Sequence, residues 1–311
     1  MVVSLVPGNR SIAFPARNLY FLIPRLEPMA FDHDRVTQLF EKLDWQLSKL
    51  SSKPQPNKIH QFRTVARRLE TVLGEVIPDQ DRKQRRLLKL LTKVRRRAGR
   101  VRDLDVQIAA LRSLKVSERP GIKTQILETM AEMRAKRERR FLDVLDKETV
   151  RELRRRLKRV REHFLYSAPN PWTLAENMLS AFLRQNDVAV DERLLHHYRI
   201  AGKKIRYIAE LAGDRPDQKH VIGELKRMQD VLGEWHDWIT LNESVRKMLP
   251  ENGNSPLLAA IGNITRAKYR DAVEAVASAK KNLVGKPGPD LPPAPIKPNT
   301  LAASAAGRAV A

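Results

Sequence analysis

The sequence predicts an all-α fold of two four-helix bundles related by pseudo-two-fold symmetry, with a basic groove or channel at the centre. Apolar residues recur at spacings of three and four from Phe31 to about Leu283, which is the period of amphipathic helices. Glycine is scarce in this range, and the period-two alternation that marks strands is nearly absent. The third observation is a pair of similar segments far apart in the chain, which indicates a duplicated helical unit.

Stretches rich in proline, glycine and asparagine divide this pattern into about ten helical segments. They stand at residues 53–57, 78–79, 119–121, 168–171, 213–216 and 250–256. We therefore expect a helical domain at residues 30–284, with halves at about 30–165 and 166–284. Residues 1–29 and 285–311 contain proline and too little periodic apolar sequence to pack, so we expect a disordered N-terminal extension and a disordered tail.

The composition predicts a polyanionic partner. The 311 residues include 59 Lys+Arg and 36 Asp+Glu, which gives a formal net charge of +23. Folding alone has no need for self-repulsion of this size, so nucleic acid, acidic lipid or a phosphate polymer is expected to bind. Cysteine is absent, which excludes disulfides, thiolate nucleophiles and thiolate metal sites. No apolar run reaches the ~20 residues that cross a bilayer, so we expect a cytoplasmic protein without membrane insertion.

The two similar segments occupy residues 60–69 and 196–205 and both read His-x-x-Arg-x-x-x-basic-basic-apolar. Each is followed by a Gly-x-x-x-Asp motif, at residues 99–103 in the first copy and 233–237 in the second. The separation from the histidine to the aspartate is 43 residues in the first copy and 41 in the second. The whole unit is therefore repeated, and two halves with approximate symmetry are expected.

Each repeated helix is expected to have one packed face and one cationic stripe. At 100° per residue the cationic positions of a copy fall within about 60° of one another, and the apolar positions fall on the opposite side. The stripes consist of His60, Arg63 and Arg67 in the first copy and of His196, Arg199 and Lys203 in the second. Helix surfaces usually intersperse Glu with Lys, because like charges four residues apart repel. Here the repulsion is uncompensated, and if the two halves face each other the stripes line a shared groove.

Further basic residues extend this predicted surface. They are Lys89, Lys93, Arg95, Arg96, Arg97, Arg100 and Arg102 in a third helical region, and Lys226 and Arg227 in its repeat counterpart. A linear phosphate polymer has a negative charge at each repeat and no side chains, so it needs an array of cations along a track. Arginine binds phosphate oxygens with a planar fork and lysine acts as a mobile point charge. A histidine beside phosphate is pushed toward its charged form, so it adds a pH-sensitive donor.

Other conspicuous residues have simpler interpretations. Asp103 and Asp237 follow glycines and are expected to be helix N-caps. The basic run at residues 134–161 has Glu and Asp interspersed and is expected to be a solvated face. The four tryptophans, Trp45, Trp172, Trp235 and Trp238, are expected in the core. A single helix-surface histidine commonly bonds to a neighbour, but two at equivalent repeat positions favour a functional role.

The repeated blocks resemble the CHAD family, the conserved-histidine α-helical domains. These blocks are HQFRTVARRLE and KVRRRAGRVRDLDV in the first half, and LHHYRIAGKKIRY and LKRMQDVLGEWHDW in the second. The likeness spans roughly residues 30–283, and four blocks in order with consistent spacing make it specific. The resemblance implies two four-helix bundles with a basic central cavity or channel that binds inorganic polyphosphate. In bacteria it also implies association with polyphosphate granules.

The resemblance also implies which residues bind the polymer. The two histidines of the family correspond to His60 and His196. Its basic positions correspond to Arg63, Arg67, Arg68, Arg199, Lys203, Lys204 and Arg206. Two departures stand out: Glu70 occupies a position where a basic residue is common, and no arginine precedes Asp237 in the second glycine motif. Both weaken the local positive field, and we expect the second half to contribute less than the first.

The expected function is non-catalytic binding of inorganic polyphosphate, without a cofactor or metal, on polyphosphate granules. Non-specific nucleic-acid binding is the main alternative, because counterion release favours any phosphate backbone that meets this many cations. The aromatic content of 5%, with no aromatic residue in the stripes, disfavours recognition of single strands.

A second alternative is a phosphohydrolase or phosphotransferase in which His60 or His196 is the phosphoryl acceptor or the general base. A Walker-type loop, a His-Glu-x-x-His motif and a carboxylate cluster for Mg²⁺ are all missing from the sequence. Attachment to acidic lipid is a third alternative, although the apolar faces are expected to be used in packing.

Overall fold

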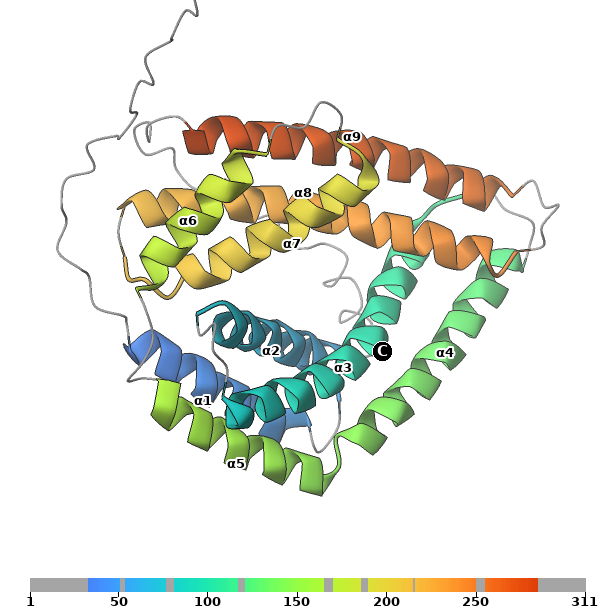
Figure 1. The fold of residues 1–311 in the computed structure, drawn as a ribbon. Helices are drawn as coiled ribbons and strands as arrows, with labels where there is room; N and C mark the ends of the chain where they lie inside the picture. Colours follow the sequence, from blue (N-terminus) through green and yellow to red (C-terminus); the bar gives the residue numbers. More distant parts are fainter. Residues whose placement is uncertain are drawn as a thin grey trace, which may run out of the picture.

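Amphipathic helices account for nearly all of the described chain in the structure, a computed structural model (Figure 1). It describes residues 33–50, 54–76, 81–116, 121–164, 170–185, 190–214, 216–249 and 255–284. These residues form nine α-helices and no β-strand, so the all-α prediction is confirmed. The expected N-terminal extension and C-terminal tail lie outside the described residues.

The helices are α1 (His33–Leu50), α2 (Pro56–Val76), α3 (Arg82–Ser113), α4 (Ile122–Val144), α5 (Lys147–Phe164), α6 (Pro171–Leu183), α7 (Glu192–Ala209), α8 (Pro216–Arg246) and α9 (Pro256–Val284). Side-chain caps begin five of them, including Asp146 before α5 and Ser255 before α9. The side chains of Asp81, Asn170 and Asp191 accept hydrogen bonds from backbone N–H groups in the first turns of α3, α6 and α7. Each cap satisfies a donor that has no partner within the helix.

The two sequence halves form two neighbouring groups of helices. In Figure 1, α1, α2 and α5 lie in the lower part with the first half of α3, and α6, α7, α8 and α9 lie in the upper part. Helix α3 rises toward α8, and α4 runs back along it. Helices α1–α4 and α6–α9 share the order of two shorter helices followed by two long ones, while α5 is an addition to the first half. The pseudo-two-fold relation of the halves stays a prediction.

One large hydrophobic cluster includes residues of both halves, among them Phe62 and Leu69 of α2 and Tyr198 and Ile205 of α7. A smaller cluster joins the C-terminal part of α3 to α4, α8 and the start of α9. At Gly202 a Cβ atom would lie 2.6 Å from Cε of Met228, so the missing side chain lets α7 and α8 approach closely. The predicted packed faces of α2 and α7 are thus confirmed.

The predicted N-cap roles of Asp103 and Asp237 are wrong. Both residues lie in the interior of long helices, α3 and α8, and Gly99 and Gly233 are helical rather than turn residues. A glycine inside a helix costs only about 1 kcal/mol relative to alanine, and the apolar spacing continues through both glycines. The two aspartates therefore project from helix surfaces.

Trp45 also departs from prediction, because its side chain is 53% exposed. It lies on α1 between the buried Leu43 and Leu47, two positions from each, and so faces the opposite side of the helix. Trp172 and Trp235 are buried as expected, and Trp238 packs against the smaller hydrophobic cluster. Among the described residues, no helix combines the length and hydropathy needed to cross a membrane.

Candidate anion-binding site

The repeated helices of the two halves lie against each other, α2 against α7 and α3 against α8. This arrangement gathers five cationic side chains, which we call the inner cluster. The inner cluster consists of Arg63 and Arg67 from α2, Arg102 from α3, and Arg199 and Lys203 from α7. Burial lowers the pKa of each of the other four members, and the charge of Arg63 lowers it further, as expected for cations within electrostatic reach of one another.

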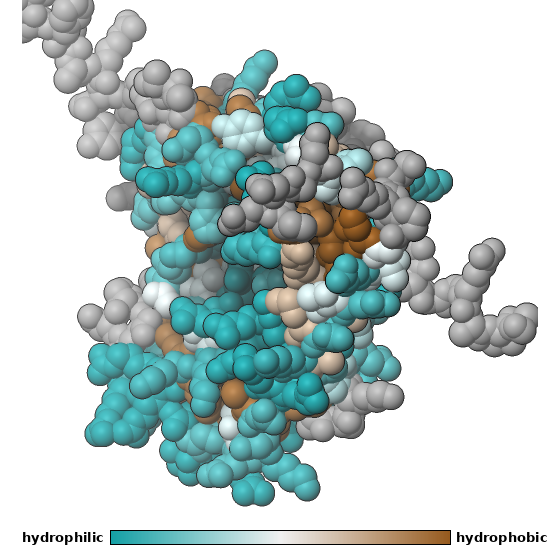
Figure 2. Space-filling view, turned by 90° about the vertical axis from the view of Figure 1, so that its right-hand side faces the viewer, coloured by the Kyte–Doolittle hydropathy of each residue, from teal (hydrophilic) through white to brown (hydrophobic). Residues whose placement is uncertain are grey.

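The inner cluster is removed from bulk water to a large extent. Arg199 is 9% exposed, and the other four members are half-buried. In Figure 2 one side of the molecule shows a hollow lined by hydrophilic residues at mid-height, the level at which the two groups of helices meet in Figure 1. Charges interact more strongly in such surroundings than on an open surface. An anion that entered would meet a concentrated positive field.

Burial has a large effect on Lys203. Desolvation first, and then the charges of Arg199, Arg67 and Arg63, lower the pKa of this lysine from 10.5 to about 7, against the opposing charge of Asp237. Lys203 is therefore close to half-protonated at neutral pH. A bound anion would raise its pKa and recruit a proton to the site.

Asp103 and Asp237, the last residues of the repeated motifs, are the carboxylates of this site. Asp103 forms an ion pair of 3.4 Å with Arg63, across the contact between α2 and α3. At Gly99, one turn earlier, a Cβ atom would lie 3.6 Å from Nε of Arg63, an ordinary contact distance, so the Arg63 side chain lies along this turn of α3. Burial raises the pKa of Asp237, while Arg199 and Arg63 oppose this rise. Asp103 and Asp237, together with Asp105 beside Arg102, thus partly balance the five cations.

Three histidines border the inner cluster. Desolvation first, and then neighbouring cations, lower the pKa values of His60 and His196. The ring of His236 lies 5.8 Å from that of His196, centroid to centroid. Burial and the charges of Arg199, His196 and Lys203 lower the pKa of His236 to about 3. The site therefore holds neutral imidazoles next to permanent cations.

His236 was not among the predicted binding residues. The repeat could have identified this residue, because aligning the two glycine motifs places His236 at the position of Arg102. The second half thus contributes a neutral imidazole where the first half contributes a guanidinium. The predicted asymmetry between the halves remains a prediction for binding measurements.

Within the described residues, Nε of Arg199 is buried and makes no hydrogen bond. A buried donor without a partner costs about 1–3 kcal/mol, so native structures seldom retain one without a reason. An anion in the inner cluster would supply the missing acceptor. The position is therefore suited to a phosphate or carboxylate oxygen.

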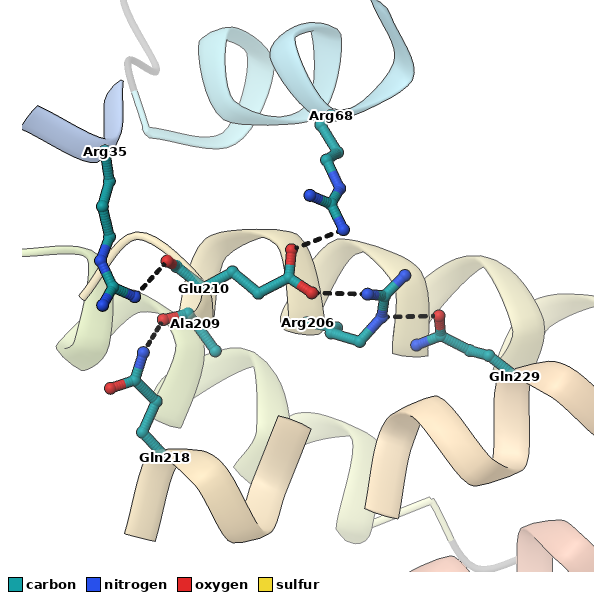
Figure 3. A network of polar contacts seen from close by, with 7 residues as sticks. All are labelled: Arg35, Arg68, Arg206, Ala209, Glu210, Gln218 and Gln229. Carbon is teal, nitrogen blue, oxygen red and sulfur yellow. Dashed lines mark hydrogen bonds and ion pairs between the residues drawn. The ribbon is translucent and has the colours of Figure 1, made fainter. Parts of the chain in front are cut away.

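Three other predicted residues, Arg68, Lys204 and Arg206, hold acidic partners instead. Figure 3 shows the carboxylate of Glu210 between Arg68 and Arg206, with Arg68 at 3.1 Å. Arg206 also donates through Nε to Oε1 of Gln229 at 2.9 Å. Lys204 pairs with Glu75 of α2 at 2.6 Å. The ion pairs of Arg68 and Lys204 bridge the two halves, whereas the contacts of Arg206 lie within the second half. Two carboxylates thus face the three cations.

The remaining predicted residues are exposed. Lys89, Lys93, Arg96 and Arg100 lie on α3, and Lys226 lies on α8 near Asp230. None is among the main charges that shift the pKa values of the inner cluster. Arg95, on another face of α3, pairs with Glu70 at 2.6 Å. Glu70, the acidic residue at a position where the family commonly has a basic one, is therefore neutralised by an arginine.

The part of the chain that the structure describes holds no group of three or more His, Cys, Asp or Glu side chains that could bind a metal ion. What the site offers chemically is therefore positive charge, arginine N–H donors and a titratable lysine. These are the groups that bind phosphate and other oxyanions.

Comparisons with known proteins agree with this architecture. The chain shares 16% identity with the crystal structure of the CHAD domain from the plant Ricinus communis, with a TM-score of 0.59, over 86% of this chain and 96% of that one. PptA from Streptomyces chartreusis gives 14% identity and a TM-score of 0.54, over 83% of this chain and 100% of that one. At these identities the likeness concerns the fold. Curated protein sequences gave no significant match. The model of the CHAD domain family matches residues 35–246, which is more than half of the chain, and the chain therefore belongs to the CHAD domain family.

Proposed function

We propose that the protein binds inorganic polyphosphate in a basic groove between its two halves and catalyses no reaction on it. The observation that carries this proposal is the inner cluster, in which five cations from three helices meet around the carboxylates of Asp103 and Asp237. The two other carboxylates that act on it, Asp105 beside Arg102 and Glu70 beside Arg67, are paired with Arg134 and Arg95. Arranging like charges in this way opposes folding, and a polyanion removes the cost when it binds.

A phosphate polymer suits this site for three reasons. Four of the five cations are arginines, whose forks match phosphate oxygens. The cluster is half-buried, so it favours a thin chain without side chains over a bulky one. The duplicated motifs present similar cations from α2 and α7, which suits a ligand that repeats the same charged group. Family membership supports the same ligand.

The absence of catalysis is part of the proposal. Hydrolysis of a phosphoanhydride needs an activated water molecule, and an effective general base has a pKa near the working pH. His236 has a pKa of about 3 and is a poor base at neutral pH. Lys203 has a pKa of about 7 in the free protein, but a bound polyanion raises that pKa, so the lysine then acts as a cation and not as a base. Incubation with polyphosphate and Mg²⁺ or Mn²⁺ should therefore release no orthophosphate. Enzyme-dependent release would overturn this part of the proposal.

The first experiment is a competition titration at physiological salt. Fluorescent long-chain polyphosphate is displaced by unlabelled polyphosphate, by duplex DNA and by RNA of matched total charge. A preference for polyphosphate of tenfold or more, equivalent to at least about 1.4 kcal/mol, would support the proposal. Equal or stronger displacement by nucleic acid would replace it with general nucleic-acid binding.

Cellular location follows from the same ligand. If the protein binds long polyphosphate chains, a fluorescent fusion should collect on polyphosphate granules in cells that make the polymer. The fusion should spread evenly in cells that cannot make it. Unchanged foci in those cells would contradict the granule assignment.

A further inference from the structure

A continuous line of cations runs along the exposed face of α3. We call it the outer stripe, and it consists of Arg82, Arg86, Lys89, Lys93, Arg96 and Arg100. Their spacing of four, three, four, three and four residues keeps all six on one side of the helix. All six side chains are exposed, unlike those of the inner cluster. The face opposite, with Leu87, Leu91 and Val94, is completely buried.

The charge of the outer stripe is uncompensated. From Arg82 to Arg102 the helix carries 11 Lys and Arg residues and no Asp or Glu. No ion pair is found for any of the six stripe residues in the described part of the chain. The charge of Lys93 contributes only a minor part of the lowering of the Asp146 pKa, which is due mainly to hydrogen bonds from Thr149. The basic helix α5 differs, because Arg154 pairs with Asp44 at 3.0 Å and Arg156 pairs with Glu152. Solvation alone therefore does not explain a stripe of this kind.

The outer stripe leads directly into the inner cluster. The next position in its spacing is Asp103, which forms the ion pair of 3.4 Å with Arg63. From Arg82 to Asp103 the helix rises about 30 Å at 1.5 Å per residue. A flexible anionic chain held at the inner cluster can therefore pass the Arg63–Asp103 ion pair and continue along the cations of α3.

A membrane surface does not fit this face. Helices that lie in a lipid interface expose an apolar side to the acyl chains. The apolar side of α3 is already used in the core, and the stripe itself presents only cations. Charge complementarity along a single line fits a linear polyanion.

We infer that the outer stripe is a second part of the polyphosphate site, which engages long chains and gives the protein a preference for them over short ones. This inference rests on the proposed function. The inner cluster then accepts a short phosphate segment, and the outer stripe holds the continuation of a longer chain.

The test compares two triple variants with equal loss of charge. The stripe variant carries Arg86→Gln, Lys89→Gln and Arg96→Gln. The matched control carries Arg151→Gln, Lys158→Gln and Arg159→Gln, which are exposed cations of α5. Each variant loses two arginines and one lysine. Glutamine is a good helix former, so circular dichroism and melting temperature should match wild type in both.

Affinities are measured for tripolyphosphate and for long-chain polyphosphate at several salt concentrations. For the stripe variant we expect at least a tenfold loss for the long chain and no change for tripolyphosphate. Three lost phosphate contacts should reduce the slope of log K against log[salt] by about two, on the value for single-stranded nucleic acids. The α5 control should keep the slope and most of the affinity.

Failure of the inference and failure of the proposed function give different results. If wild type binds long and short chains but the stripe variant behaves like the α5 control, the inference is overturned and the proposed function stands. If wild type binds neither ligand, the proposed function fails first. If the stripe variant loses affinity for duplex DNA and keeps its affinity for polyphosphate, the stripe contacts nucleic acid and the inference is wrong.

Discussion

Glu210, which caps the C-terminal end of α7, forms an ion pair of 3.1 Å with Arg68 of α2 (Figure 3). The same carboxylate pairs with Arg206, and its backbone carbonyl accepts a hydrogen bond of 3.1 Å from Arg35 of α1. One residue of the second half thus holds cations from two helices of the first half. Arg68, a predicted binding residue, thus connects the two halves, and Arg206, another one, binds the same carboxylate from within α7.

Glu210→Gln should therefore destabilise the protein. Arg68 and Arg206 would lose their counter-charge in a half-buried position, which costs about 1–2 kcal/mol in the free energy of unfolding. Urea unfolding measures this difference. Arg154→Gln is the control, since its ion pair with Asp44 is more exposed and should contribute less than about 1 kcal/mol. Equal losses in the two variants would show that Glu210 does not tie the halves together.

Arg63→Gln combined with Arg199→Gln should weaken binding of long-chain polyphosphate at least tenfold. Each substitution removes a guanidinium from the inner cluster, and together they weaken the field from both α2 and α7. The melting temperature should change little, because mutual repulsion in the cluster also decreases. A binding titration measures the affinity, and thermal unfolding measures the melting temperature.

Arg151→Gln with Arg159→Gln removes the same two charges from exposed positions of α5 and serves as the matched control. If both double variants lose the same affinity, only the net charge of the protein matters. If the inner-cluster variant unfolds, Arg63 and Arg199 support the core instead of binding a ligand.

Polyphosphate affinity should fall as the pH rises from 6 to 8.5. Lys203 has a pKa of about 7 in the free protein and loses its charge over this range, while the anion favours the protonated form. The neighbouring His196 and His236 have lowered pKa values and are neutral over most of it. Titrations at pH 6, 7 and 8.5 test the trend.

Lys203→Arg isolates the lysine from other titrating groups. An arginine remains charged throughout this range, so the variant should bind with nearly the same affinity at all three pH values. A pH dependence identical to that of wild type would assign the effect to the histidines or to the ligand.

The stability of the ligand-free protein should respond to pH in the opposite sense. The folded-state pKa of Lys203 lies below its unfolded value of 10.5, so the unfolded state binds more protons between pH 7 and 10.5. The unfavourable contribution of this lysine is complete below pH 7 and disappears as the pH rises toward 10.5. Between pH 7 and 9 the free energy of unfolding of wild type should therefore rise relative to that of Lys203→Gln. A constant difference between the two proteins would refute the lowered pKa.

Some of the site was predictable and some was not. The helical periodicity placed Arg63, Arg67, Arg199 and Lys203 on stripes opposite the apolar residues, and the structure brings these four together. The N-cap roles of Asp103 and Asp237 were wrong, because a local glycine motif reads the same whether the helix ends or continues there. Whether the helix ends or continues at each glycine depends on its tertiary contacts, which the local motif does not contain.

The sequence by itself determined the helical class, the duplicated unit and the face on which each repeated cation lies, because helix geometry relates residues that are close along the chain. The tertiary structure decided which cations are compensated. Glu210 and Glu75 neutralise Arg68 and Lys204 across the contact between the halves. The inner cluster, by contrast, is only partly balanced by its aspartates, and the outer stripe has no ion pair among the described residues. Coulomb interactions act through space, so residues more than a hundred positions apart set the charge that remains for a ligand.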